Sequence, residues 1–170
     1  MRKFFHKLAI ACLVALPIAG TGQAQTRAEG KAPQVRAFPD LTPIYRVAGV
    51  ADSGDGPNDG FATVVHCTNF AASNKQVQFI VRDFQGNGMA RSTHAVSAHA
   101  TFTAATHISF VFVEDAVLTR DTPINQGSMI IKATTRKVHC SAMIIDAGAS
   151  VPNGIALSLT RLNQEKNAQE

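Results

Sequence analysis

Tryptophan is absent from this chain of 170 residues, and Tyr45 is its only tyrosine. Sandwich domains that bind carbohydrate commonly stack sugar rings on Trp or Tyr, so this composition disfavours that function. An antibody-type immunoglobulin core is excluded as well. Such a core has a buried Trp and a Tyr two residues before its second cysteine, where this chain has Val138.

The short patterns that accompany many catalytic sites are also missing. The chain has no G-x-S-x-G elbow, no zincin helix motif, and no Walker or dinucleotide glycine pattern. Glu114 and Asp115 are adjacent, whereas glycoside hydrolysis needs carboxyl groups that face each other across a substrate. The sequence therefore predicts a protein that is not an enzyme and uses no cofactor.

Long apolar runs are confined to the beginning of the chain. Arg2, Lys3 and Lys7 precede an apolar segment at 8–18, and small residues lead to Ala24. This order is typical of a secretory signal peptide over residues 1–24. The apolar segment is shorter than the roughly 20 residues that a membrane span needs, and we expect no transmembrane segment after signal removal. The prediction is export to the periplasm or the extracellular space.

An excess of positive charge is missing once this leader is set aside. Three of the 16 Lys and Arg residues lie in the leader, which has no acidic residue, so 13 cations face 12 carboxylates in the remainder. Those cations are scattered along the chain, and the densest spot is Arg136–Lys137 with Lys132 nearby. Nucleic-acid binding needs a concentrated basic face, so we expect no nucleic-acid partner.

The remaining residues are enough for one domain with a hydrophobic core. Residues 25–43 are polar, contain prolines and show no periodicity, which predicts a flexible lead-in. Residues 163–170 read as a solvated polar tail. The folded domain is predicted over 44–162.

Within 44–162 the apolar residues mostly alternate with polar ones, which is the pattern of β-strands. β-Branched residues dominate, and only 114–119 could form a turn of helix. We predict an all-β fold, an antiparallel β-sandwich of immunoglobulin-like architecture with seven or eight short strands; a mixed α+β domain is the alternative. The expected strands cover 44–50, 61–69, 76–84, 89–97, 101–113, 127–135, 138–146 and a last one through Ile155, Leu157 and Leu159.

Cysteine is scarce, and the two that follow the leader each come directly after a histidine, as His66-Cys67 and His139-Cys140. Neighbouring side chains on a strand point to opposite faces, so a histidine and the cysteine after it cannot bind the same ion. An exported chain with two cysteines in apolar strands is a candidate for a disulfide. We predict a Cys67–Cys140 bond, which closes a 73-residue loop and stabilises the fold by at most roughly 4 kcal/mol.

The disulfide can be placed in either of two ways. If Cys67 and Cys140 are opposite each other on antiparallel strands, then His66 opposes Ser141 and His139 opposes Thr68, with the imidazoles on a diagonal. If the bond instead joins two stacked sheets, the histidines lie on outer surfaces more than ~10 Å apart. Both arrangements turn the histidines away from the sulfurs.

The other histidines raise the alternative of a periplasmic copper or zinc protein that uses surface histidines, namely His66, His139 and either His94 or His107. His94 and His99 have opposite parity, and eight extended residues separate His99 from His107 by about 26 Å. The methionines at 89, 129 and 143 are not clustered, and core packing accounts for them equally well. We therefore predict no metal site.

The segment 52–60, DSGDGPNDG, is the most loop-like stretch. Asp52, Asp55, Asn58 and Asp59 could supply oxygen ligands to calcium. An EF-hand loop starting at Asp55 would, however, have Pro57 at its third position and no Glu at its twelfth. A hairpin connection built from turn-forming residues is the favoured interpretation.

The sequence thus predicts an exported, non-catalytic β-sandwich that serves the cell envelope as a binding or structural module. Its partner, an envelope protein or a surface ligand, is not identified by any motif.

Overall fold

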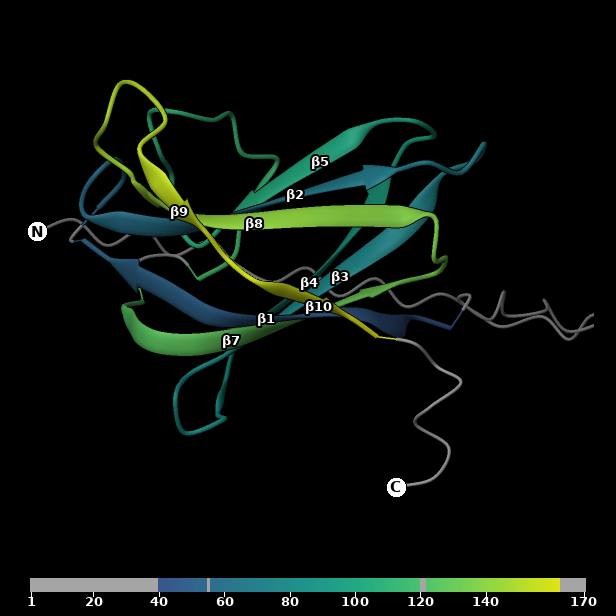
Figure 1. The fold of residues 1–170 in the computed structure, drawn as a ribbon, viewed down its shortest axis with the longest axis horizontal. Helices are drawn as coiled ribbons and strands as arrows, with labels where there is room; N and C mark the ends of the chain where they lie inside the picture. The colour runs from purple at the N-terminus through teal and green to yellow at the C-terminus, as the bar shows by residue number, and fades with distance from the viewer. Residues whose placement is uncertain (1–39, 55, 120–121, 163–170) are drawn as a thin grey trace, which may run out of the picture. The chain divides into compact units, whose positions relative to one another are not determined.

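The computed structural model describes residues 40–54, 56–119 and 122–162, all within the compact unit Ala37–Glu170 (Figure 1). The predicted signal peptide at 1–24, most of the lead-in and the polar tail lie outside the described residues. Strands make up the regular structure of the described part, in which no helix long and apolar enough to cross a membrane occurs.

The strands follow one another along the chain with short connections. The first begins at Thr42, two residues before the predicted start of the domain. The ten strands are β1 (Thr42–Ser53), β2 (Phe61–Asn69), β3 (Lys75–Arg82), β4 (Gly88–Val96), β5 (Thr101–Ala105), β6 (Ala116–Val117), β7 (Ile124–Ala133), β8 (Val138–Asp146), β9 (Gly154–Ala156) and β10 (Leu159–Arg161).

All strand pairs are antiparallel except the short pair β5·β6. The order is β4-β3-β7-β1-β2-β5-β6, with β8 on the other edge of β2 and β9 beside β8. The predicted all-β fold is confirmed. Its hydrogen bonds, however, join the strands into one curled sheet and do not divide them into the two separate sheets of an immunoglobulin-like sandwich.

The curl of the sheet depends on β1. Its register shifts between Ala48 and Val50, where Gly49 has φ +76°, a backbone conformation that favours glycine. Before this bulge β1 pairs with β10, and at its end it pairs with β2. Residues 154–161 pair first with β8 and then with β1, so they pass from one layer of the sheet to the other (Figure 1).

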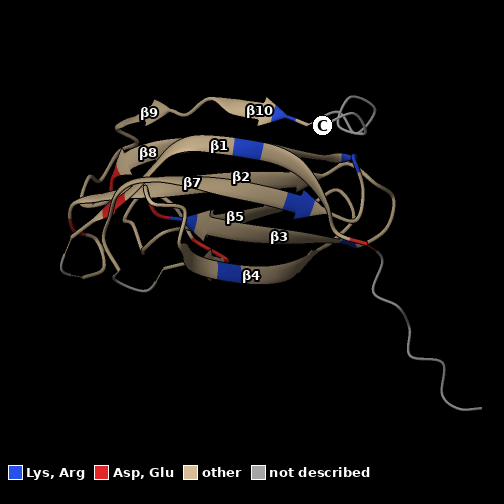
Figure 2. Ribbon diagram, turned by 90° about the horizontal axis from the view of Figure 1, so that it is seen from below, with Lys and Arg blue, Asp and Glu red and all other residues tan. Residues whose placement is uncertain are grey.

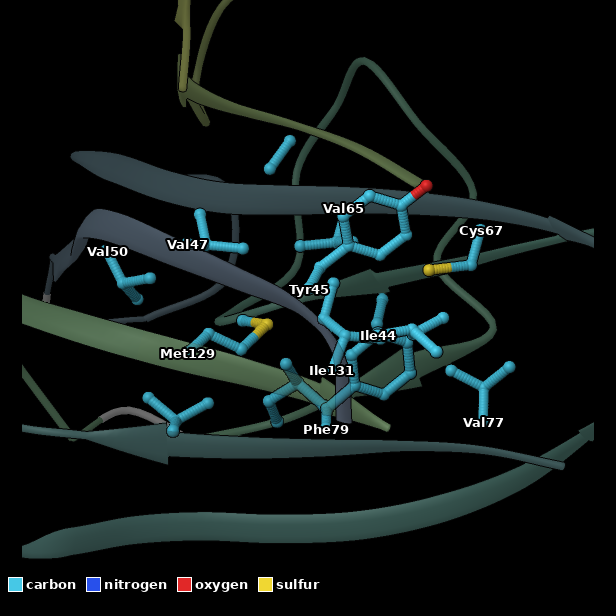
Figure 3. Close-up of a cluster of buried hydrophobic side chains, with 14 of the residues drawn as sticks. Ile44, Tyr45, Val47, Val50, Val65, Cys67, Val77, Phe79, Met129 and Ile131 are labelled. Carbon is cyan, nitrogen blue, oxygen red and sulfur yellow. The ribbon is translucent and has the colours of Figure 1, made fainter. Parts of the chain in front are cut away.

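The main hydrophobic core lies between these layers. Phe79, Met129 and Ile131 from β3 and β7 are almost completely buried and face Val65 and Cys67 of β2 (Figure 3). A smaller cluster covers the opposite face of β2 and β8. Its partly buried members from the chain after β5 are Val111 and Phe112.

The predicted strand at 101–113 is wrong beyond Ala105, where β5 ends. The side chains of Thr106, His107 and Ser109 are buried and form hydrogen bonds within the fold, so residues 106–113 do not continue the strand ladder. Ile108 and Phe110 are exposed instead of sharing a buried face. Alternation of apolar residues was therefore misleading in this segment.

Candidate functional site

A buried polar cluster anchors the β1–β2 loop. Asp52, near the end of β1, forms a hydrogen bond and ion pair with Nδ1 of His107, and both side chains are below 5% exposed. Nε2 of His107 donates to the backbone oxygen of Asp59 at 2.9 Å. Because that carbonyl can only accept, Nε2 carries a hydrogen, and Nδ1 makes its hydrogen bond with the carboxyl group of Asp52.

Thr119 completes this arrangement, which we name the His107 cluster: Asp52, Asp59, Thr106, His107 and Thr119. The hydroxyl of Thr119 lies 2.6 Å from the second carboxylate oxygen of Asp52 and 2.7 Å from the carbonyl oxygen of Thr106. Both imidazole nitrogens are thus engaged within the fold. Asp52, Thr106, His107 and Thr119 are buried, and the exposed Asp59 contributes its backbone oxygen. Its geometry fits a structural role, since a general base needs an accessible nitrogen.

This arrangement also changes the interpretation of the 52–60 segment. The carboxylate of Asp52 is directed into the protein toward His107 and Thr119. One carboxylate oxygen of Asp59 accepts from the backbone nitrogen of Gly60. Asn58 has φ +62°, as expected of a turn residue, and Asp55 lies outside the described residues.

Three loops meet above the His107 cluster and carry exposed apolar side chains. The backbone nitrogen of Asn58 donates to the oxygen of Ile108, that of Phe110 to Ala147, and that of Ala147 to Gly60, at 2.9–3.0 Å. We name this surface the apolar loop end. Its large exposed side chains, 39–74% accessible, are Phe61, Ile108, Phe110, Val151 and Ile155.

The apolar loop end contains a pocket of about 480 Å³. Phe61 of β2 and Ile155 of β9 line it on opposite sides, together with Ile144, Ile145 and Asn153. The adjacent strand β9 is fully exposed and pairs only with β8 among the described strands. A shallow apolar pocket beside an unpaired strand edge can accept an extended peptide.

The sulfurs of Cys67 and Cys140 are joined in a disulfide across the adjacent strands β2 and β8, and their Cα atoms lie 4.1 Å apart. His66 pairs with Ser141 and His139 with Thr68. This is the first of the two predicted arrangements, with both histidines on the face away from the sulfurs.

The two histidines beside the disulfide have separate surroundings. His66 Nδ1 lies 3.0 Å from the hydroxyl of Thr103, and its ring contacts Phe112 edge-on. Burial lowers the pKa of His66, and the charge of Glu114 partly opposes this shift. His139 packs edge-on against Phe70 on the surface.

The remaining histidines do not join them. His94 of β4 stacks on Phe102, with ring centroids 4.7 Å apart, and burial lowers its pKa against the opposing charge of Asp115. His99 lies in the β4–β5 turn with φ +60°. Across the described ranges, no three His, Cys, Asp or Glu side chains are placed to hold a metal ion.

Other candidate residues have structural environments. Met129 belongs to the core, and Met89 and Met143 are partly buried against the two clusters. Glu114 accepts hydrogen bonds from the backbone nitrogen and hydroxyl of Ser109, while Asp115 accepts from the backbone nitrogen of Thr103. These adjacent carboxylates bind the chain after β5 to itself and to β5.

Comparison with known proteins adds no assignment. No family model matches the chain, and neither does a curated protein. The chain is similar to part of the solved structure of PfGH50B, with 14% sequence identity and a TM-score of 0.31 over 75% of this chain. The match covers 24% of that protein, and a likeness of this size carries no argument about function.

Sequence reasoning missed both the His107 cluster and the apolar loop end. The sequence did contain one indication of the apolar loop end, the continuous apolar run FVFV at 110–113, in which apolar and polar residues no longer alternate. The cluster had no such signal, because Asp52 and His107 are 55 residues apart and only the fold brings them together.

Proposed function

We propose that this protein is an exported, non-catalytic binding module of the cell envelope that binds a protein partner at its apolar loop end. The observation that carries the proposal is the number of large apolar side chains exposed at this end of the fold, of which Phe61 and Ile155 line a pocket. Exposed apolar side chains beside a pocket are a common mark of an interaction site.

The form of the surface favours an extended apolar segment of the partner. β9 exposes one edge, so a partner strand could form backbone hydrogen bonds there, and the pocket could receive one of its side chains. Backbone pairing would supply affinity, and the pocket would select an apolar residue at one position.

The His107 cluster supports this role by fixing the loops in advance. It ties the β1–β2 loop to the chain after β5 through buried hydrogen bonds. A surface that is already ordered loses less conformational entropy when a partner binds.

Export is proposed from two features. Residues 1–24 have the composition of a secretory signal, and disulfides such as Cys67–Cys140 persist in oxidising compartments. Together they favour the periplasm or the extracellular space.

The test uses a photo-reactive phenylalanine analogue in place of Phe110, in the full chain expressed in cells. The matched control carries the analogue at Phe70, which is similarly exposed. Phe70 follows the C-terminal end of β2, whereas the apolar loop end includes Phe61 at the N-terminal end of that strand. We expect one envelope protein to be crosslinked from position 110 and not from position 70. Adding Ile155→Asp should abolish that product without loss of the folded protein.

Equal crosslinking from both positions, or a product that survives Ile155→Asp, would contradict the proposal. A crosslink between two copies of this chain would point to self-association instead, and it would likewise overturn the proposed envelope partner.

A further inference from the structure

The fold gathers the positive charges that are scattered in the sequence. Every described Lys and Arg lies on the layer formed by β1, β3, β4, β7 and β10 or in the turn that leaves β7 (Figure 2). None lies on β2, β5, β6, β8 or β9. These residues are Arg46, Lys75, Arg82, Arg91, Lys132, Arg136, Lys137 and Arg161.

Strand register places part of this set on one outward face. Arg91 pairs with Ile80, Ile80 with Ile130, and Ile130 with Arg46, in one row across β4, β3, β7 and β1. Three strand spacings separate Arg91 from Arg46, about 14 Å. Arg82 follows Ile80 by two residues and Lys132 follows Ile130 by two residues, so both have the same facing as the row and lie on opposite sides of it because the strands are antiparallel. We name the group Arg46, Arg82, Arg91 and Lys132 the cationic face.

The cationic face has no carboxylate among the outward-facing residues of its strands. Asp83 lies in the turn beyond Arg82, but its carboxylate accepts hydrogen bonds from Gln85 and Asn87 of that turn. Asp40 lies before β1 and is exposed.

The cations of this face also have no ionic partners of their own. No Lys or Arg forms an ion pair with another residue in the described part of the chain, where the recorded ion pair is His107–Asp52. Arg82 donates to the carbonyl oxygen of Gly86 at 2.7 Å. Like charges held together without partners create a field that attracts polyvalent anions.

A pocket of about 340 Å³ lies on this face between two of the cations. Arg82 and Arg91 line it, and Ile80, which is 6% exposed, contributes to its floor. A guanidinium group can bind a carboxylate or sulfate through two parallel hydrogen bonds. Arg82 and Arg91 thus form a binding site for one acidic group of a ligand. If the ligand is a polymer, Arg46 and Lys132 can bind the acidic groups that come before and after it.

We propose that the cationic face binds a linear acidic glycan through charge and hydrogen bonds, without the ring stacking on Trp or Tyr for which this composition is poor. The outward side chains between the cations include Gln78, Thr93 and Ser128, which can form hydrogen bonds with sugar hydroxyls. This proposal concerns a different surface from the apolar loop end and does not depend on the proposed function.

Nucleic acid fits this face less well. Single-stranded nucleic acid is held by successive aromatic rings on which its bases stack. The outward positions of these strands carry no aromatic side chain, and Phe84 in the turn beyond Arg82 is the one exposed ring beside them in the described residues.

A bilayer surface is also disfavoured. Amphipathic surfaces that lie in a membrane insert large apolar side chains among the lipids. On the cationic face Ile80 is buried, Ile130 and Met89 are only partly exposed, and Phe84 in the turn beyond Arg82 is the one large apolar side chain exposed beside it among the described residues. A single exposed ring is a small apolar surface for insertion among lipids.

The experiment measures binding of the mature protein to polygalacturonate and to dextran sulfate, with neutral dextran, single-stranded DNA and anionic phospholipid vesicles as the other arms. The test variant is Arg46→Gln/Arg91→Gln. The control Lys75→Gln/Lys137→Gln removes the same charge away from the face.

We expect binding to at least one acidic glycan and none to neutral dextran. The affinity should fall about tenfold or more in the test variant and less than about threefold in the control, and it should weaken with added salt. The two glycan arms show whether carboxylate or sulfate is preferred.

Three results would overturn the proposal. They are no binding to either acidic glycan at low salt, equal losses in the test and control variants, or tighter binding of DNA or vesicles than of glycan through the same arginines. Retention of glycan binding by Ile155→Asp is expected, which separates this proposal from the docking of a protein at the apolar loop end.

Discussion

At the scale of single residues, the His107 cluster is the feature of the fold that we expect to be most sensitive to substitution. Asp52 and His107 are both buried and are paired with each other. Removing either partner leaves the other buried without its counter-charge, which costs more than losing an exposed ion pair. The pair is therefore expected to behave as a unit.

A double-mutant cycle tests this. We expect Asp52→Asn and His107→Gln each to lower the free energy of unfolding by about 2–4 kcal/mol. The double variant should lose less than the sum by more than about 1 kcal/mol, because neither partner is then left alone. Urea unfolding monitored by circular dichroism measures all four corners of the cycle. Losses that add within about 0.5 kcal/mol would show that the two side chains are not coupled.

His94 gives the protein a pH-dependent contribution to stability. Burial lowers the pKa of His94 in the folded state below its usual value of about 6.5. As the pH falls, the unfolded chain takes up a proton first, so the contribution is complete above about pH 6.5 and is lost as the pH falls through the folded pKa. The free energy of unfolding should therefore fall between about pH 7 and pH 5.

His94→Phe should make that pH dependence shallower, since Phe can keep the stacking on Phe102 and cannot be protonated. His94 Nε2 is also buried without a partner in the described residues, so the substitution should not destabilise the protein at pH 7. The control is His99→Asn, which changes an exposed histidine and keeps a residue that tolerates positive φ. Urea titrations at several pH values give the slope of the unfolding free energy against pH for each variant. An unchanged slope in His94→Phe would show that His94 does not cause the pH dependence.

At the scale of strands, the sequence predicted some elements accurately and others poorly, for physical reasons. The bounds of β2 and β8 match the predicted 61–69 and 138–146, because both segments are rich in apolar and β-branched residues and end at the turn-forming residues Asn69 and Asp146. Alternation failed after Ala105, where buried polar side chains end the ladder. Neither the His107 cluster nor the cationic face was predictable, since each brings together residues that are distant in sequence: the cluster through the path of the chain after β5, and the face through strand register.

Strand β9 depends on close approach of its first residue to β8. A Cβ atom at Gly154 would lie 2.3 Å from the backbone oxygen of Ile144 and 2.8 Å from the side chain of Ile145. Gly154→Ala should therefore separate β9 from β8 at a cost of about 1–3 kcal/mol, while β2 and β8 stay paired. Gly88→Ala is the control, because nothing lies within 4 Å of a Cβ there.

Hydrogen exchange measured by NMR provides the readout for this variant. The amide of Leu157, which donates to Ala142, should exchange faster in Gly154→Ala than in the native protein. Amides of the β2–β8 ladder should be unaffected. Unchanged protection of Leu157 would show that β8 and β9 can shift to accept the methyl group.

At the scale of the whole molecule, the disulfide acts through the length of chain that it closes. Cys67 and Cys140 join strands that already pair over nine positions, so the bond is not needed to hold β2 and β8 together. Its main effect is to restrict the unfolded chain over their sequence separation of 73 residues. The native fold should therefore form without it, but with a smaller margin of stability.

The variant Cys67→Ala/Cys140→Ala should keep its native circular dichroism and lose about 2–4 kcal/mol of unfolding free energy. Loss of the buried Cys67 sulfur adds a small packing term, because that side chain is fully enclosed in the core. Reduction of the native protein should give a similar decrease without the packing change, which separates the two contributions. Equal urea midpoints for the oxidised protein and the double variant would mean that the bond does not restrict the unfolded state. A variant that cannot fold would mean that the β2–β8 ladder is insufficient without the disulfide.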